Sequence, residues 1–201
     1  LKGTGNILEW KEIKINKDSQ EVFVSSDDDK IKQIVLKYDN IKFIERPKDL
    51  CSDSSSTESA LLHVLDTVFF KDNMPQWIMT LAPTSPFRSA ESISKFASLM
   101  VESNDEIDCF MSVTENKGDF WVKQNGYLIK RLFPEAPRRQ QDREPLYEEN
   151  GAIYLTRSSS LLLTGKIFGI RTVGIPIPVL EGFDINTMED FRIAESILKN
   201  Y

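Results

Sequence analysis

Two oxygen-bearing side chains, Asp184 and Asn186, stand two positions apart near the carboxyl end of the chain. In an extended segment, residues i and i+2 point to the same side, so both side chains would face one ligand. A carboxylate beside an amide carbonyl suits Mg²⁺ (or Mn²⁺), because Mg²⁺ is usually held by one or two carboxylates together with phosphate oxygens and water. The same residues would also form a simple turn before a helix that starts near Thr187, and the sequence leaves both interpretations open.

A second group of candidates follows the segment Ile41 to Ile44, which has the composition of a strand. Arg46 comes directly after it and precedes Pro47, which places the guanidinium in a loop at an edge of a sheet, where α/β proteins bind their ligands. Ser56 and Thr57 lie at the start of a predicted helix, whose first N–H groups are free to bind polar ligand atoms. The alternative is that these hydroxyls only cap the helix.

The sequence gives little support for a catalytic histidine or for a zinc site. His63, the only histidine, lies in the middle of an apolar helical segment and is best explained as a structural residue. Cys51 and Cys109 are too few and too far apart for a disulfide framework or a zinc site. The first residues lack the apolar core of a signal peptide. We therefore expect a cytoplasmic protein with two reduced thiols.

The elements that must position these residues alternate along the chain. Apolar segments predict strands, and periodic apolar positions predict helices that begin near Asp29, Ser55, Ser89 and Thr187. The predicted strands are 21–25, 41–44, 77–81, 108–113, 152–155 and 171–175. This alternation predicts an α/β fold with a mostly parallel sheet covered by helices on both faces.

One stretch interrupts the alternation. Between Phe120 and Leu132, two short apolar segments flank the turn Gln124-Asn125-Gly126, which predicts a β-hairpin. An element this small cannot bury Trp121 and Tyr127 by itself, so we expect residues 115–145 to form an inserted lid or dimerisation element within a single domain spanning 1–201.

Composition narrows the class of partner. The chain has 201 residues, of which 40% are hydrophobic and 28% charged, and its formal net charge is −6. An acidic balance disfavours binding to nucleic acid or to an anionic membrane. The longest apolar runs are far too short to cross a bilayer. We therefore expect neither nucleic acid nor membrane as a partner.

Six sequence phrases, taken together, are similar to a known family. They are Ser25-Ser26-Asp27-Asp28, Glu45-Arg46-Pro47 with 52–58, Pro83-Thr84-Ser85-Pro86-Phe87-Arg88, Arg138-Arg139-Gln140, Glu149-Asn150-Gly151-Ala152-Ile153-Tyr154 and Asp184-Ile185-Asn186-Thr187. In this order and spacing they resemble the acylneuraminate cytidylyltransferases, also called CMP-sialic acid synthetases, from about Val22 to Leu198.

The resemblance implies a fold and a reaction. The fold is a three-layer, Rossmann-like nucleotide-diphospho-sugar transferase fold with a mostly parallel mixed sheet, and the inserted hairpin reaches across a homodimer. The reaction transfers CMP from CTP to the anomeric hydroxyl of a nonulosonic, sialic-acid-like sugar acid and releases pyrophosphate. Such a reaction needs a divalent cation and cationic groups around the phosphates, but no protein nucleophile, because the sugar supplies the attacking hydroxyl.

The resemblance also implies site residues. Asp184 and Asn186 correspond to metal ligands, and Asp184 and Arg139 to the catalytic pair. Nucleotide contacts are implied for Lys2, Arg46, Ser56 and Thr57. Substrate contacts are implied for Arg88, Arg138, Arg139 and Asn150, with Arg138 and Arg139 as alternative partners of the sugar carboxylate, because one extra residue before Asn150 shifts the register.

Several positions depart from the family pattern. Asn186 replaces an aspartate, Ala82 replaces a glutamine, and Glu148 replaces an arginine. The family's Gly-rich phosphate loop is matched only by Leu1-Lys2-Gly3, and the segment before Val22 is too short to hold that loop with its strand and helix. We expect a truncated chain or joined segments; without the loop, CTP would lose its main phosphate cradle.

Three functions therefore stay open. The chain is a CMP transferase for a nonulosonic acid, a related nucleotidyltransferase that uses another sugar acid or nucleotide, or a non-catalytic sugar-nucleotide-binding homologue.

Overall fold

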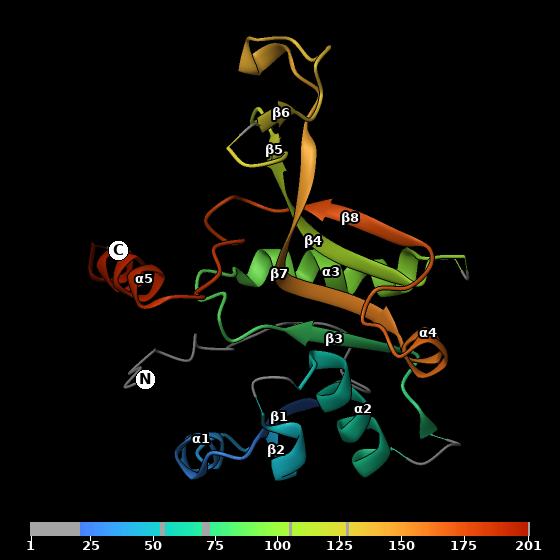
Figure 1. Ribbon diagram of the computed structural model, residues 1–201. Helices are drawn as coiled ribbons and strands as arrows, with labels where there is room; N and C mark the ends of the chain where they lie inside the picture. The colour runs from blue at the N-terminus through green and yellow to red at the C-terminus, as the bar shows by residue number, and fades with distance from the viewer. Residues whose placement is uncertain (1–20, 53–54, 70–72, 105, 128, 201) are drawn as a thin grey trace.

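The computed structural model describes residues 21–52, 55–69, 73–104, 106–127 and 129–200. Its helices and strands follow one another in the alternating order that the sequence predicts (Figure 1). The elements are β1 (Val22–Ser26), α1 (Asp29–Val35), β2 (Ile41–Glu45), η1 (Lys48–Leu50), α2 (Thr57–Val68), β3 (Trp77–Leu81), α3 (Ala90–Glu102), β4 (Cys109–Asn116), β5 (Trp121–Lys123), β6 (Ile129–Arg131), η3 (Gln140–Asp142), β7 (Leu146–Arg157), α4 (Ser158–Thr164), β8 (Thr172–Pro176) and α5 (Met188–Asn200).

The central sheet has the strand order β3-β7-β4-β8. Strand β4 is parallel to β8, whereas β7 is antiparallel to both of its neighbours, so three strands run in one direction and β7 runs against them. Strands β1 and β2 form a separate parallel pair. The α/β class is confirmed, and the sheet is mixed.

Strand β7 is much longer than the predicted strand 152–155. Its first residues, from Leu146 to Glu149, are exposed and pair with Val113–Asn116 beyond the core. In the sequence, Leu146 and Tyr147 are followed by two glutamates, and so short an apolar run is not enough to predict a strand.

A pronounced bulge interrupts the pairing of β4 with β7. Met111 pairs with Tyr154 and Val113 pairs with Glu149, so Ser112 alone faces residues 150–153. Gly151, inside the bulge, has a φ of 71°, a conformation that glycine adopts without steric cost. The bulge turns the chain around Asn150, and bulges of this kind often redirect side chains next to active sites.

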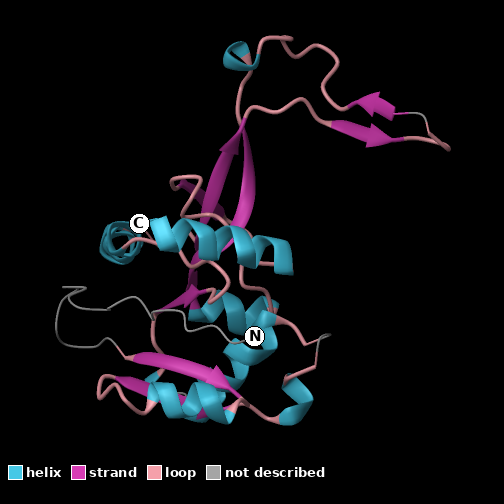
Figure 2. Ribbon diagram, turned by 90° about the vertical axis from the view of Figure 1, so that its left-hand side faces the viewer, coloured by secondary structure: helices cyan, strands magenta, loops and turns pink. Residues whose placement is uncertain are grey.

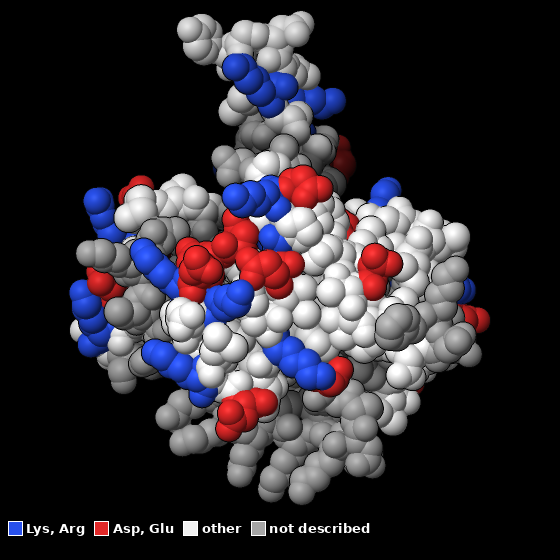
Figure 3. Space-filling view, turned by 90° about the horizontal axis from the view of Figure 1, so that it is seen from below, with Lys and Arg blue, Asp and Glu red and all other residues white. Residues whose placement is uncertain are grey.

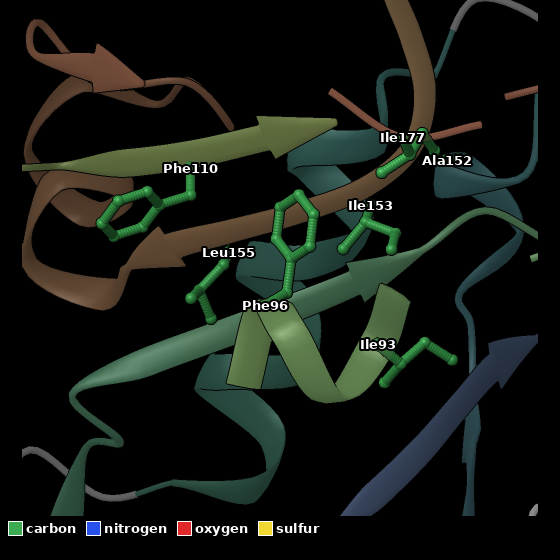
Figure 4. Close-up of a cluster of buried hydrophobic side chains, with 7 residues drawn as sticks. All are labelled: Ile93, Phe96, Phe110, Ala152, Ile153, Leu155 and Ile177. Atoms are coloured by element: carbon green, nitrogen blue, oxygen red, sulfur yellow. The ribbon is translucent and has the colours of Figure 1, made fainter. Parts of the chain in front are cut away.

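The core lies between α3 and the central sheet. Ile93 and Phe96 of α3 pack with Phe110 and with side chains from β7 and the segment after β8 (Figure 4). Phe96 is fully buried, and its truncation to alanine would cost about 3–5 kcal/mol. This packing confirms the apolar face predicted for 93–100 and fixes the frame from which the site residues extend.

All four predicted helix starts lie within two residues of the observed ones, since α1 begins at Asp29, α2 at Thr57, α3 at Ala90 and α5 at Met188. Ser89 caps α3, its hydroxyl accepting a hydrogen bond from the backbone N–H of Ser92. At α5, Thr187 and Asp190 bond reciprocally through side chain and backbone. Helix α2 is capped by Ser56, one residue after the predicted start near Ser55, so the capping role considered above for this hydroxyl is present.

The predicted hairpin is present as β5 and β6, and it projects from the body of the molecule with the segment that follows it (Figures 1 and 2). We call residues 117–145 the arm. At its base Asp119 accepts hydrogen bonds from Arg131, Arg138 and Arg143, with distances of 2.7, 3.2 and 3.3 Å. These contacts hold the return segment of the arm against its start.

Two observations bear on the expected partners. On the face seen from below, acidic and basic side chains are interspersed and form no continuous basic surface in that view (Figure 3). Within the part of the chain that the structure describes, none of the helices combines the length and the apolar composition that a bilayer crossing requires.

Candidate active site

A pocket of about 530 Å³ opens where the bulge of β7 meets the loop 177–187 between β8 and α5. Its lining includes three of the residues predicted from the sequence, Asn150, Asp184 and Asn186. The structure thus brings together residues that are more than thirty positions apart and come from two different elements.

Asn150 is held by three hydrogen bonds. Its carbonyl oxygen accepts from the hydroxyl of Ser112 at 2.6 Å and from the backbone N–H of Ala152 at 3.2 Å, and its amide nitrogen donates to Thr114 Oγ1 at 3.0 Å. The hydroxyl of Ser112, which is buried, also accepts from the backbone N–H of Ile153. The side chain of Asn150 is therefore fixed before any ligand binds, and one amide hydrogen is left without a partner among the described residues.

Gly182 lets the loop 177–187 approach this network. A Cβ atom at Gly182 would lie 2.7 Å from both Asn150 Nδ2 and Thr114 Oγ1, too close for any side chain. Only glycine therefore permits the loop to lie directly against the hydrogen-bonded groups of the two strands.

Asp184 is half-buried in the same loop, and its Oδ1 atom is buried without a hydrogen-bond partner. The backbone on its carboxyl side is fixed, because the N–H of Ile185 donates to the carbonyl of Thr84 at 2.9 Å. A buried carboxylate oxygen without a partner is unfavourable, so it would gain more than a solvated one from a cation.

Asn186 is exposed at the mouth of the pocket, and its backbone is held in place by Asp190. The carboxylate of Asp190 accepts from the backbone N–H of Asn186 at 3.1 Å and from the N–H and hydroxyl of Thr187. The hydrogen bonds from Thr187 and Asn186 hold the pKa of Asp190 below its usual value. The turn predicted as the alternative to metal binding is thus present. It engages the backbone of Asn186 and not its side chain.

The donor set fits Mg²⁺ in the manner expected of a phosphate-binding site. Asp184 supplies one carboxylate and Asn186 one amide carbonyl, and Mg²⁺ completes its shell with water and phosphate oxygens in such sites. Among the described residues, no group of three or more His, Cys, Asp or Glu side chains is arranged to hold a metal by protein ligands alone.

Two carboxylates in the pocket were not predicted as site residues. Glu148 was noted only as a departure from the family pattern, and Glu149 only as the first residue of a sequence phrase; both line the pocket with Tyr154. The hydroxyl of Tyr154 donates to the Glu149 carboxylate, and burial together with this contact raises the pKa of Tyr154. Glu148 and Glu149 directly precede Asn150 in the sequence, but only the pocket shows that their side chains lie beside it.

Arg88 supports the site from within the fold. It is 8% exposed, and its guanidinium donates to the carbonyl oxygens of Ala82 and Ala152, both at 2.9 Å. The carbonyl of Ala152 lies in the bulge of β7, so Arg88 satisfies a backbone group inside the bulge. A direct contact with the substrate, as predicted from the sequence, stays a prediction.

The other predicted nucleotide-binding residues lie outside this pocket. Arg46 follows β2 and donates to the carbonyl and hydroxyl of Ser25 at 2.6 and 3.2 Å, joining the carboxyl ends of β1 and β2. Ser56 accepts from the N–H of Ser59 as the cap of α2, and Thr57 is exposed as its first residue. Their proposed contacts with nucleotide stay predictions, and Lys2 lies outside the described residues.

Arg138 and Arg139 lie on the arm, where both side chains are largely exposed. Arg138 donates to Asp119 at 3.2 Å, and Arg139 makes a loose ion pair with Asp142 at 3.7 Å. Neither lines the pocket of its own chain. A contact of either guanidinium with a sugar carboxylate stays a prediction.

Comparison with known proteins agrees with the sequence phrases, although no family model matches the chain. It is 28% identical over 179 residues to the N-acylneuraminate cytidylyltransferase of Streptococcus agalactiae serotype III, an alignment that covers 87% of this chain and 41% of that protein. It is 23% identical to the CMP-N,N'-diacetyllegionaminic acid synthase of Legionella pneumophila, over 90% of this chain and 78% of that one. The resemblance to the acylneuraminate cytidylyltransferase family is confirmed. The chain spans less than half the length of the streptococcal relative.

Solved structures show the fold. A 4-diphosphocytidyl-2C-methyl-D-erythritol synthase from Anaerococcus prevotii matches with a TM-score of 0.59 at 15% identity, covering 89% of this chain and 78% of that one. A CMP:2-keto-3-deoxy-manno-octonic acid synthetase complexed with CTP matches with a TM-score of 0.57 at 16% identity, covering 90% and 81%. The predicted Rossmann-like nucleotidyltransferase fold is therefore confirmed.

Proposed function

We propose that this chain transfers CMP from CTP to the anomeric hydroxyl of a nonulosonic sugar acid and releases pyrophosphate. The observation that carries the proposal is the pocket in which Asn150, Asp184 and Asn186 meet, with a carboxylate oxygen of Asp184 buried and unpaired. The relatives supply the chemistry, since both are named for the synthesis of CMP-sugar acids or for cytidylyl transfer to them.

In this proposal each described side chain has a limited role. Asp184 and Asn186 hold Mg²⁺ or Mn²⁺, which when bound neutralises charge on the nucleotide phosphates. Asn150, immobilised by Ser112 and Thr114, offers its remaining amide hydrogen to an oxygen of the sugar acid. No described residue has to act as a nucleophile, because the sugar hydroxyl attacks the α-phosphorus and pyrophosphate leaves.

The arm belongs to the same proposal as a dimerisation element. It exposes several large apolar side chains, whose burial in a homodimer would be favourable: Trp121, Val122, Tyr127, Ile129, Leu132 and Phe133. Leu128, also expected to contribute, lies outside the described residues. In a homodimer the arm would bring Arg138 and Arg139 to the partner's pocket, where a guanidinium can bind a carboxylate through two hydrogen bonds.

Sedimentation at micromolar concentration tests the dimer. The expected result is a dimer for the wild type and a shift toward monomer for Trp121→Ser, with unchanged circular dichroism. A wild type that sediments as a monomer would remove both the dimer and the proposed role of Arg139. The proposed use of CTP is consistent with a cytoplasmic location, which belongs to the same proposal.

The second candidate, a nucleotidyltransferase for a different sugar acid, is favoured by Glu148. This carboxylate lines the pocket where the family pattern has an arginine, so it would repel an anionic group of the substrate at that position. The acceptor would then place a neutral or cationic group, and not its carboxylate, beside Glu148.

Pyrophosphate release distinguishes these functions. The wild type is assayed with CTP, UTP, ATP or GTP, each with N-acetylneuraminic acid, a legionaminic acid or an eight-carbon ketodeoxy acid, and with Mg²⁺ or a chelator. Release that requires CTP, a nine-carbon acid and Mg²⁺ is the expected result. Release with another pair would establish the second candidate, and no release with any pair would support a non-catalytic homologue.

A further inference from the structure

Glu181 connects the loop that carries Asp184 to a distant helix. Its two carboxylate oxygens both contact Ser89, which lies 92 positions earlier in the chain. Oε2 accepts from the backbone N–H of Ser89 at 3.0 Å, and Oε1 accepts from its hydroxyl at 2.9 Å. A carboxylate that accepts two such bonds from one residue is restricted in both position and orientation.

Ser89 is itself fixed, because it caps α3. Its hydroxyl donates to Glu181 while accepting from the N–H of Ser92 at 3.1 Å, so one oxygen serves both the helix and the loop. The amino end of a helix carries partial positive charge, which favours a carboxylate at this place. Because α3 supplies Ile93 and Phe96 to the core, Glu181 is joined to a rigid part of the molecule.

Arg88, the residue before Ser89, links Glu181 to the side of the pocket formed by β7. Burial lowers the pKa of the Arg88 guanidinium, and the charge of Glu181 acts in the opposite direction. Arg88 in turn donates to the carbonyl of Ala152 in the bulge that carries Asn150. The charge of Glu181 therefore favours the ionised guanidinium of Arg88, which supports the side of the pocket that carries Asn150.

Two further contacts hold the loop 177–187 against the segment 84–87. The N–H of Ile185 donates to Thr84 at 2.9 Å, and the rings of Phe87 and Phe183 meet edge to face with centroids 5.9 Å apart. These contacts lie on either side of Asp184 in the sequence. Neither of them contributes a charge to compensate Arg88.

We propose that Glu181 is a positioning residue that holds Asp184 in register with Asn150, an inference that rests on the proposed function of the pocket. Glu181 itself is not among the residues that line the pocket, and its carboxylate is bound to Ser89. Its hydrogen bonds to Ser89 fix the loop 177–187 against α3. Its charge acts on Arg88, which binds the bulge of β7.

The test compares Glu181→Ala and Glu181→Gln with the wild type. The glutamine keeps the shape and one acceptor oxygen but loses the charge, so it should behave between alanine and wild type. Glu195→Gln is the matched control, because Glu195 makes an exposed ion pair with Lys199 on α5 and takes no part in the contact between Glu181 and Ser89. Circular dichroism confirms that each variant is folded.

The first readout is amide hydrogen exchange in the loop 177–187, which needs no substrate. Losing hydrogen bonds to a charged group should raise the exchange rate of Ile185 and its neighbours at least about tenfold in Glu181→Ala, less in Glu181→Gln and not in Glu195→Gln. Amides in the middle of α5 should keep their wild-type rates. Unchanged exchange in the loop would overturn the proposal.

The second readout is the rate of pyrophosphate release. In Glu181→Ala, kcat should fall and the Mg²⁺ concentration for half-maximal rate should rise, while the KM for CTP stays near its wild-type value. Faster exchange with wild-type kcat and Mg²⁺ dependence would reduce Glu181 to a structural residue and overturn the proposal. A wild type without activity would instead refute the proposed function, and the exchange rates would still decide whether Glu181 fixes the loop.

Discussion

Replacing Ser112 by alanine should destabilise the protein far more than the loss of one hydroxyl suggests. The Ser112 hydroxyl donates to Asn150 and accepts from the N–H of Ile153, and both Ser112 and Ile153 are almost completely buried. Alanine would leave the N–H of Ile153 buried without a partner and would remove one of the two bonds to the Asn150 carbonyl.

The magnitude follows from these two losses. An unpaired buried donor costs about 1–3 kcal/mol and a lost hydrogen bond about 1 kcal/mol, which gives a decrease of about 2–4 kcal/mol in the free energy of unfolding. For a chain of this length, that corresponds to a decrease in Tm of roughly 5–15 °C. Thermal unfolding followed by circular dichroism measures the shift.

Ser158→Ala is the matched control. Ser158 is as deeply buried as Ser112, but its hydroxyl has no hydrogen-bond partner in the structure. Removing it should change the free energy of unfolding by no more than about 0.5 kcal/mol, or increase it. Similar Tm values for the two variants would refute the reasoning, because they would show that the network around Asn150 contributes nothing.

Three further changes test other parts of the site. Asn186→Asp adds a charge beside the proposed cation and should lower the Mg²⁺ concentration for half-maximal rate several-fold, since charged contacts are roughly twice as strong as neutral ones; an unchanged Mg²⁺ titration would remove Asn186 from the metal site. Gly182→Ala places a Cβ against Asn150 and should cost about 1–3 kcal/mol of stability and raise the KM for the sugar acid, whereas wild-type Tm and KM would show that the contact is not tight. The hydrogen bond from Arg131 holds the pKa of Asp119 below its usual value, so its stabilisation of the arm is present above about pH 4 and is lost as the pH falls through the lowered pKa. Hydrogen exchange of the arm, corrected for intrinsic rates, should therefore accelerate at acid pH in the wild type, and a constant degree of protection down to pH 3 would contradict this.

Local signals in the sequence were sufficient for most of the fold. The strand 77–81, the cap at Ser89 and the hairpin turn at Asn125-Gly126 each follow from apolar alternation, from capping residues or from turn chemistry, and each is present. The direction of β7 could not be predicted in this way. Periodicity specifies which residues are buried but not which neighbour a strand pairs with, and the apolar run at the start of β7, Leu146 and Tyr147, is too short to predict a strand.

The site was predictable only where its residues belong to a motif. Asp184 and Asn186 stand together in the sequence, and Asn150 belongs to a separate phrase, so all three were found. Glu181 and Ser112 act through contacts with residues far away in the chain, and nothing in their own surroundings marks them. Arg88 was identified as a site residue by its motif, whereas its observed contacts are with backbone carbonyls inside the fold.

Pyrophosphate release by Asp184→Asn tests the central claim most directly. The substitution keeps the shape of the side chain and alters a carboxylate whose Oδ1 has no partner to lose, so the fold and Tm should be preserved. With CTP, Mg²⁺ and a nine-carbon sugar acid, we expect the wild type to release pyrophosphate and Asp184→Asn to be at least about a hundredfold slower, since a metal-binding carboxylate supplies several kcal/mol of charge stabilisation. A variant that turns over within twofold of the wild-type rate, or a wild type that releases no pyrophosphate with any such acid, would contradict the account.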